Sequence, residues 1–245
     1  MIPRTRVTLT AFIGGTDSGA ATFRGLASDG NYYWIKAPNN PQGSRSLIPE
    51  RVVTHIGLLL GAPVRPIALI DIPDGMGISY RPGYPLRAGV AHGSLELGAS
   101  KVIDDWRGLA NRDGNRERAA YLSALWDLCE GVDPQWLSEF DGDAAIWSFD
   151  HGFWFAGEVD WSPSQMSGGP WEHPSIDTAS RAALLAAAQK VEALTLNSLQ
   201  EVTSDVPVEW GTNPEEMSAL ARTIYNKVPG VAERLRRAAE NCTHP

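Results

Sequence analysis

The chain has 245 residues, 43% of them hydrophobic, which is enough for one large domain or two small lobes and excludes a disordered protein. Its formal net charge of −8 argues against a nucleic-acid partner, because binding a phosphate backbone normally requires a basic surface. The longest apolar stretch, residues 56–64, is interrupted by Gly and Pro and cannot span a bilayer, so no membrane partner is expected. The start of the chain predicts no signal peptide, and two distant cysteines predict neither a disulfide framework nor a zinc site. We therefore expect a cytoplasmic protein.

The first hundred residues predict a small antiparallel sheet with one helix. The helix is expected at residues 46–60, where apolar residues recur at helical spacing. A loop rich in Gly and Pro is expected at 73–88. The expected strands cover residues 5–13, 20–24, 32–38, 64–72 and 90–97.

A glycine-rich turn is expected between the first two strands. It consists of Gly14, Gly15, Thr16, Asp17, Ser18 and Gly19. Backbone N–H groups in such a turn are free to approach an anion, so it is either a phosphate-covering loop or an ordinary hairpin tip. A Walker motif is excluded, because no Gly-Lys-Ser/Thr follows.

Lys36 interrupts a strand of bulky residues near its end. A lysine on a core strand is costly to bury unless it is paired or meets an anion, although its head can also reach solvent. Glu50 lies in the first turns of the expected helix, where its carboxylate could reach Lys36 and hold it in place.

Residues 99–245 predict a mostly helical half. It contains a hairpin at 136–149, which turns at 141–143. Helical character is expected at 100–130, 178–199, 214–228 and 229–241. A proline at the start of each of the last two segments is favourable for a helix.

Asp150 ends the hairpin, after an apolar run of high strand propensity and before His151 and Gly152. A carboxylate in this place can hold a divalent metal next to a bound phosphate, or it can simply open a turn. We interpret His151 as a packing or turn-stabilising residue. A second carboxylate, Asp133, lies just before the hairpin.

Together these segments resemble the HipA-like kinases over about residues 12–155. The most specific parts are the Asn-Pro-Gln-Gly run at 40–43 and the Asp-His-Gly run at 150–152. The resemblance implies an α+β, two-lobed, protein-kinase-like fold, with a sheet-rich lobe at 1–98 and a helical lobe at 99–245. The segments that carry it are 14–16, 33–36, 40–45, 60–64, 92–94 and 149–152.

The resemblance also implies ATP and Mg²⁺ as cofactors and a place for each part of the nucleotide. Residues 14–18 would cover the phosphates, and Lys36 would contact the α- and β-phosphates with Glu50 as its partner. Glu96 and Leu97 would lie at the hinge against adenine.

For the transfer itself, the resemblance assigns Asp150 to Mg²⁺ and Asp133 to orienting or deprotonating the acceptor hydroxyl. The family's catalytic loop usually reads Asn-x-Asp-Arg with a second Asn after it, whereas residues 131–135 here read Gly-Val-Asp-Pro-Gln. Gln135 could replace the second metal ligand. Asp113 also lies in an Asn-x-Asp run, but a whole helix separates it from Asp150, so Asp133 is preferred.

Two functions follow from this pattern. The first is an ATP- and Mg²⁺-dependent phosphotransferase that acts on a hydroxyl of a protein Ser/Thr or of a small molecule. The alternative is a catalytically impaired kinase-like module that binds nucleotide or serves as a scaffold, since the loop at 131–136 is degraded. A hydrolase is disfavoured, because no nucleophile-elbow motif is present. Trp147, Trp154, Trp161 and Trp171 are interpreted as packing residues or as an aromatic acceptor pocket in the loop 153–176.

Overall fold

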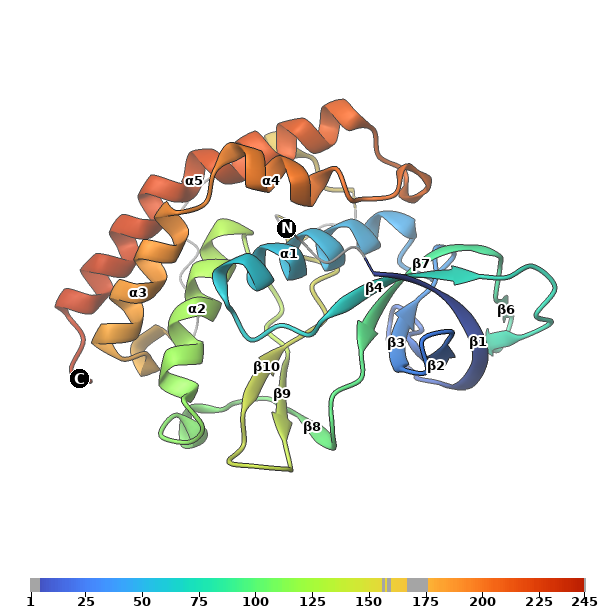
Figure 1. The fold of residues 1–245 in the computed structure, drawn as a ribbon, viewed down its shortest axis with the longest axis horizontal. Helices are drawn as coiled ribbons and strands as arrows, with labels where there is room; N and C mark the ends of the chain where they lie inside the picture. The colour runs from blue at the N-terminus through green and yellow to red at the C-terminus, as the bar shows by residue number, and fades with distance from the viewer. Residues whose placement is uncertain (1–4, 156, 158–159, 167–175, 245) are drawn as a thin grey trace.

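A computed structural model describes residues 5–155, 157, 160–166 and 176–244 of the chain. Strands form a barrel at one end of the molecule, and helices form a layer at the other end (Figure 1). Within the described residues, no helix combines the length and the apolar character needed to cross a membrane.

A closed five-stranded barrel forms most of the N-terminal part. Its strands, in spatial order, are β1 (Arg6–Gly15), β2 (Phe23–Ala27), β3 (Tyr32–Lys36), β7 (Gly89–Leu95) and β4 (Ile67–Ile72). Neighbouring strands in the barrel are antiparallel, except that β1 and β4 pair in parallel at Arg6–Thr8. The predicted antiparallel sheet is therefore closed by one parallel contact, because β1 is long enough to reach across to β4. The barrel core includes Leu9, Phe23, Ile35 and Ile70.

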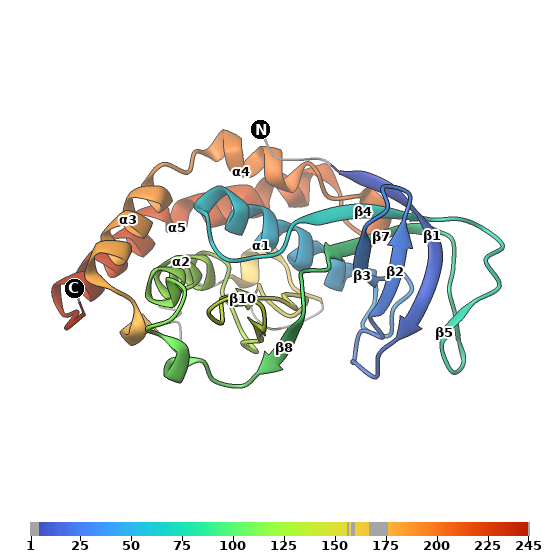
Figure 2. The same ribbon diagram turned by 60° about the horizontal axis from the view of Figure 1, so that its bottom comes forward.

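Two predictions about the first turn are wrong. Gly14 and Gly15 are the last residues of β1, where they pair with Arg24 and Phe23. The second strand begins at Phe23 rather than at residue 20. The turn itself therefore spans residues 16–22. The loop at 73–88 contains a small hairpin of β5 (Ser79–Arg81) and β6 (Tyr84–Pro85), which extends from the barrel on the side away from the helices (Figure 2).

Helix α1 (Leu47–Leu60) confirms the predicted helix and lies at the centre of the molecule (Figure 1). All of its residues except Leu58 and Leu59 are buried. It contacts β7 of the barrel as well as three helices of the helical layer, α2 (Asn115–Leu128), α3 (Arg181–Glu192) and α4 (Leu196–Thr203). Gly61 ends α1 in a left-handed conformation with φ of 81°, which glycine adopts without strain.

A three-stranded sheet connects the barrel to the helical layer. Its order is β10 (Ile146–Ser148), β9 (Trp136–Glu139) and β8 (Ser100–Ile103). The pairing of β9 with β10 confirms the predicted hairpin. The helical prediction for residues 100–103 is wrong, because these residues pair with β9. Helix α2 (Asn115–Leu128) follows later in the same predicted segment.

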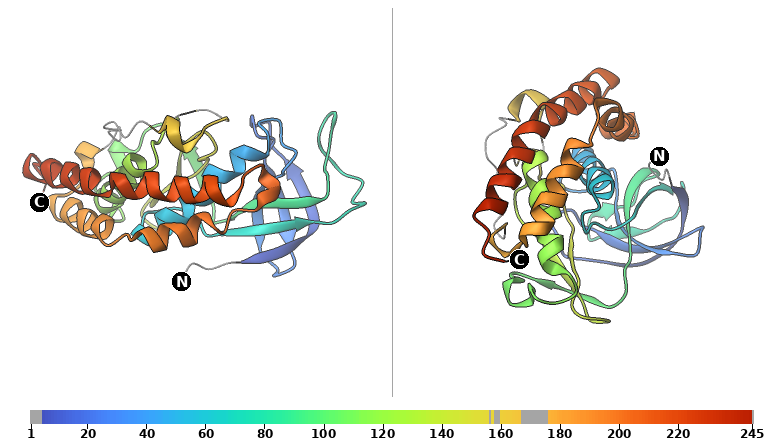
Figure 3. Two further views of the ribbon diagram at one scale, coloured as in Figure 1. Left: turned by 90° about the horizontal axis from the view of Figure 1, so that it is seen from above. Right: turned by 60° about the vertical axis from the view of Figure 1, so that its left-hand side comes forward.

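The C-terminal helices differ from the prediction in two places. The helix predicted at 178–199 is divided into α3 (Arg181–Glu192) and α4 (Leu196–Thr203), because Thr195 caps a new helix with its side chain. The two helices predicted after residue 213 are one continuous helix, α5 (Pro214–Glu240), which runs along α3 and α4 (Figure 3). Pro229 costs α5 one backbone hydrogen bond, but the buried apolar stripe on both sides of it keeps the helix continuous. Short 3-10 helices cover Ser44–Ser46, Arg107–Leu109, Pro163–Gln165, Ile176–Thr178 and Val208–Trp210.

The buried apolar residues form two clusters. One fills the barrel, and the other fills the helical layer together with the three-stranded sheet. Helix α1 belongs to the second cluster although it lies within residues 1–98. The boundary between the two core clusters therefore does not coincide with residue 98. The predicted division into lobes at residue 98 stays a prediction.

The two glycines of β1 provide a matched test of this fold. A Cβ on Gly15 would lie 2.5 Å from the carbonyl oxygen of Tyr80, whereas a Cβ on Gly14 would meet nothing within 4 Å. Gly15→Ala should therefore displace the buried Tyr80 and lower the free energy of unfolding by about 1–3 kcal/mol, while Gly14→Ala should change it by less than about 0.5 kcal/mol. Urea unfolding of both variants checks this, and equal losses would contradict the packing described.

Candidate active site

A cleft of about 400 Å³ lies between the barrel and the three-stranded sheet. Its lining combines the β1–β2 turn, the faces of β3 and β7 that point away from the barrel core, and residues at the ends of β9 and β10. The lining residues are Thr16, Ser18, Thr22, Trp34, Lys36, Glu50, Arg65, His92, Ser94, Ser100, Val102, Gln135, Leu137, Phe149 and Asp150. Several of the residues predicted from the sequence therefore meet in one place.

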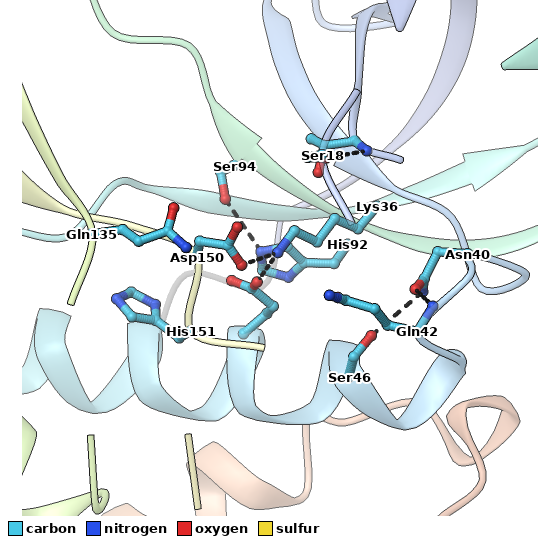
Figure 4. Close-up of polar contacts among 12 residues, drawn as sticks. Ser18, Lys36, Asn40, Gln42, Ser46, His92, Ser94, Gln135, Asp150 and His151 are labelled. Atoms are coloured by element: carbon cyan, nitrogen blue, oxygen red, sulfur yellow. Dashed lines mark hydrogen bonds and ion pairs between the residues drawn. The ribbon is translucent and has the colours of Figure 1, made fainter. Parts of the chain in front are cut away.

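Lys36 is the buried cation of this cleft. Its Nζ donates to Oε1 of Glu50 and to Oδ1 of Asp150, the latter at 2.5 Å (Figure 4). Burial alone lowers the pKa of Lys36, but the two carboxylates outweigh burial and raise that pKa above its ordinary value. Lys36 is therefore protonated at physiological pH, and the predicted Lys36–Glu50 pair is confirmed.

Glu50 is the buried anion of the same group, with a relative exposure of 3%. Burial raises the pKa of Glu50, whereas the charge of Lys36 and the backbone N–H of His151 lower it, and the net effect is a lowered pKa. Glu50 therefore stays ionised and fixes the position of the Lys36 ammonium.

Asp150 occupies an uncommon backbone conformation. Its φ of 59° lies in the left-handed region, which non-glycine residues rarely adopt, and such strain often accompanies functional sites. Its side chain is 24% exposed and faces the cleft, with Gln135 beside it (Figure 4). The structure thus brings together the two residues predicted to bind the metal.

The described residues contain no group of three or more His, Cys, Asp or Glu side chains that could hold a metal ion. A Mg²⁺ ion fits this donor set nonetheless, because Mg²⁺ usually takes one or two protein oxygens and completes its shell with phosphates and water. The carboxylate of Asp150 and the amide oxygen of Gln135 are the protein ligands that the cleft offers.

His151 packs beneath the end of the hairpin next to Asp150, as the interpretation of the sequence expects. Its Nδ1 lies 3.3 Å from Oγ1 of Thr54 and its Nε2 lies 3.0 Å from Oγ of Ser148. The ring also packs edge-on against Trp154, with centroids 4.7 Å apart. Burial, aided by the charge of Lys36 and opposed by Glu50 and Asp150, lowers the pKa of His151 to about 4. His151 is therefore neutral at physiological pH.

The β1–β2 turn faces the cleft with hydroxyl groups rather than with glycines. Oγ1 of Thr16 donates to the carbonyl of Thr22 and lies 2.9 Å from Oγ of Ser18, and the backbone N–H of Thr22 donates to Oγ of Ser18. Thr16 and Ser18 line the cleft, whereas Gly14, Gly15 and Asp17 are not among its lining residues.

Glu96 and Leu97 lie directly after β7, beside the cleft rather than in it. They line a neighbouring hollow of about 430 Å³, which shares Trp34 and Ser100 with the cleft. The carboxylate of Glu96 accepts two hydrogen bonds from Arg24, at 2.8 and 2.7 Å. Its side chain is therefore occupied in holding β2.

Asp133 is not brought into the cleft. Its side chain is exposed, its φ is 51°, and its carboxylate accepts a 3.2 Å hydrogen bond from Nε2 of Gln135. Gln135 itself lines the cleft, so Asp133 is connected to the cleft only through its hydrogen bond with Gln135. Asp113 lies in the exposed turn before α2, where its carboxylate pairs with Arg118.

The tryptophans behave mainly as packing residues. Trp154 and Trp161 are buried, and Trp154 packs edge-on against Trp126. Trp147 stacks with the guanidinium of Arg118. Trp171 and half of the predicted acceptor-pocket loop at 153–176 lie outside the described residues.

Several residues of the cleft wall were not predicted from the sequence as site residues, among them Trp34, Leu137 and Arg65. Trp34 lies two positions before Lys36 in β3, so both side chains are on the same face of the strand. This alternation could have placed Trp34 in the site from the sequence. Arg65 follows a run of buried residues at 62–64, and its burial has no local signal.

Comparisons with known proteins are informative for the fold. No family model matches the chain, and no curated protein matches its sequence. The proinflammatory kinase CtkA of Helicobacter pylori is similar over 98% of this chain and 99% of that chain, with a TM-score of 0.61 and 11% identity. Two structures of the Golgi casein kinase, one with Mn and ADP bound, have TM-scores of 0.47 and 0.48, 10% identity, and coverage of 98% of this chain and 74% of that chain. The likeness to CtkA shows that the chain has a kinase-like α+β fold.

The neutral state of His151 predicts a pH dependence of stability. Because its pKa falls from 6.5 to about 4 on folding, the unfolded chain binds a proton between these values that the folded protein does not. The part of the stability that depends on His151 should thus be fully present above pH 6.5 and should fall by up to about 3 kcal/mol as the pH drops toward 4. His151→Gln should flatten this slope in urea unfolding, whereas the control His244→Gln should keep it. An unchanged slope in His151→Gln would contradict the assignment.

Proposed function

We propose that this protein is a phosphotransferase that moves the γ-phosphate of a nucleoside triphosphate to a hydroxyl acceptor. The observation that carries the proposal is the Lys36 ammonium, held between Glu50 and Asp150 in a cleft of a kinase-like fold. Phosphoryl transfer depends on positioning and on neutralising phosphate charge, and a fixed cation beside a metal-binding carboxylate meets both needs.

Each residue of the cleft then has a defined task. Lys36 binds the α- and β-phosphates, and Glu50 keeps it in place. The hydroxyl groups of Thr16 and Ser18 lie above the phosphates. Asp150 and Gln135 hold Mg²⁺, which supplies further neutralisation of the phosphate charge. These assignments rest on the geometry of the lining residues.

The finer description follows the sequence resemblance. On this resemblance, the chain is a HipA-like kinase that uses ATP as its phosphate donor. Its two lobes cover residues 1–98 and 99–245, and Glu96 and Leu97 lie near the bound base. A protein Ser/Thr or a small molecule serves as acceptor, and the protein acts in the cytoplasm. The high coverage of CtkA, itself a kinase, supports this description at the level of the fold.

The position of Asp133 favours a second candidate function. Its carboxylate is exposed and hydrogen-bonded to Gln135, outside the lining of the cleft. A kinase-like module that binds nucleotide without transferring phosphate would need Lys36, Glu50 and Asp150 but no acceptor base.

Calorimetric titration with nucleoside triphosphate tests the cleft. Binding should require Mg²⁺, and Lys36→Met or Asp150→Asn should weaken it by at least about tenfold, because each removes a charged contact. Lys190→Met, which removes an exposed lysine of α3, should leave binding unchanged. Tight binding that survives both cleft substitutions would refute the proposed function.

Phosphoryl transfer by an Asp133→Asn variant separates the two candidate functions. If Asp133 positions the acceptor, the variant should lose about 100-fold or more in turnover and keep its affinity for nucleotide. Autophosphorylation with radiolabelled nucleotide is the readout. Turnover equal to that of the wild type would remove Asp133 from the mechanism, and binding without turnover in both proteins would favour the scaffold.

A further inference from the structure

Arg65 is a buried cation of the cleft to which the proposed function gives no task. It is buried, with a relative exposure of 7%, and it lines the cleft just before β4. Its Nε has no hydrogen-bond partner, and no residue in the described part of the chain forms an ion pair or hydrogen bond with its guanidinium. Its guanidinium lies over the ring of Phe149, whose centroid is 5.9 Å from Cζ. Burial lowers the pKa of Arg65 to about 10, so the guanidinium is still charged at physiological pH.

A buried charge without a partner is costly, and proteins usually pair such groups. The carboxylates of Glu96 and Glu139 are near enough to favour the charged form of Arg65, but neither forms a hydrogen bond or an ion pair with it among the described residues. Glu96 is already bound to Arg24 through two hydrogen bonds. A guanidinium that faces a cleft without a protein partner points to a ligand that supplies acceptor atoms.

Strand register places Arg65 at the end of the cleft away from the phosphate site. Lys36 lies opposite His92, and Trp34 lies opposite Ser94. Ile67 also lies opposite Ser94, and the carbonyl of Pro66 accepts from the N–H of Leu95, so Arg65 enters beyond this level. Two residues along a strand span about 7 Å, which separates a phosphate on Lys36 from a base near Trp34.

The walls at that end suit a flat ring. Trp34 provides an aromatic face, and Leu137 provides an apolar one from β9. Ser94, whose Oγ lies 3.2 Å from Nε2 of His92, is a small residue that lines the cleft together with Arg65. The base edge would therefore meet hydrogen-bond donors.

The chemistry of the two purines then differs. A guanidinium only donates hydrogen bonds, and its fork matches the adjacent O6 and N7 acceptors of guanine. Adenine offers N7 as an acceptor but places an amino donor where guanine has O6. Donors would then face each other in a buried place, which is unfavourable.

We propose that Arg65 reads the edge of the nucleobase, so that the cleft binds a 6-oxopurine nucleotide such as GTP in preference to ATP. This inference rests on the proposed function, because it needs a nucleotide whose phosphates lie on Lys36. It changes the expected donor and leaves the phosphate and metal residues as described.

Calorimetric titrations with Mg²⁺ and GTP, ITP, 7-deaza-GTP or ATP test the inference. Wild-type protein should bind GTP and ITP at least about tenfold more tightly than ATP, because both carry O6 and N7. Affinity for 7-deaza-GTP should fall between them, since it lacks N7. Arg65→Met should abolish the difference, and Arg65→Lys should reduce it, because lysine keeps the charge without the fork. Arg222→Met, which removes an exposed arginine of α5, should keep the wild-type preference.

Thermal unfolding of the free protein distinguishes a binding role of Arg65 from a purely structural one. Replacing a structural arginine would lower the melting temperature. Arg65→Met removes a buried charge without a partner, so its melting temperature should equal or exceed that of the wild type. ATP bound as tightly as GTP by the wild type, or a preference for GTP that survives Arg65→Met, would overturn this inference and leave the proposed function standing. Failure of every purine nucleotide to bind would overturn both.

Discussion

The structure depends on the charge of Lys36 and on the two carboxylates that hold it. An isolated charge of this kind costs several kcal/mol to bury, and breaking a buried pair typically costs about 3–5 kcal/mol. The three partners come from β3, from α1 and from the end of β10, so the group joins the barrel, the central helix and the hairpin. Apolar residues in the same space would stabilise the fold at least as well. A buried charged group in a cleft therefore indicates a functional role rather than a stabilising one.

Helix α1 carries Glu50, and the C-terminal layer holds α1 in place. Arg51 pairs with Asp205 at the end of α4, and Arg45 pairs with Glu216 in the first turn of α5. Trp210 between these helices is buried, and its Nε1 donates to a carbonyl of β7 at 2.7 Å. The helical layer thus fixes α1 against the barrel, and through α1 it fixes the position of the Lys36 ammonium. Contacts far from the cleft therefore determine the geometry inside it.

The sequence predicted those features that local patterns determine. Alternation and helical spacing located α1, the barrel strands and the β9–β10 hairpin to within a few residues, and a lysine inside a bulky strand indicated a buried pair. Closure of the barrel was not predictable, because it depends on β1 meeting a strand about sixty residues away in parallel. The continuity of α5 through Pro229 likewise depends on the core that it covers. Arg65 was missed because its surroundings are made by residues far away in the sequence, such as Phe149 after β10. Asp133 was placed by motif order, which does not determine where a side chain points.

The central claim is that nucleotide phosphates lie on Lys36, and covalent labelling tests it most directly. A nucleoside acyl phosphate carries a reactive carbonyl at its phosphate end and acylates the nearest amine. The chain has only four lysines, at positions 36, 101, 190 and 227, so mass spectrometry can assign the modified residue without ambiguity. We expect acylation of Lys36, suppressed by excess unmodified nucleotide with Mg²⁺. Labelling that spares Lys36, or that unmodified nucleotide does not suppress, would contradict the claim.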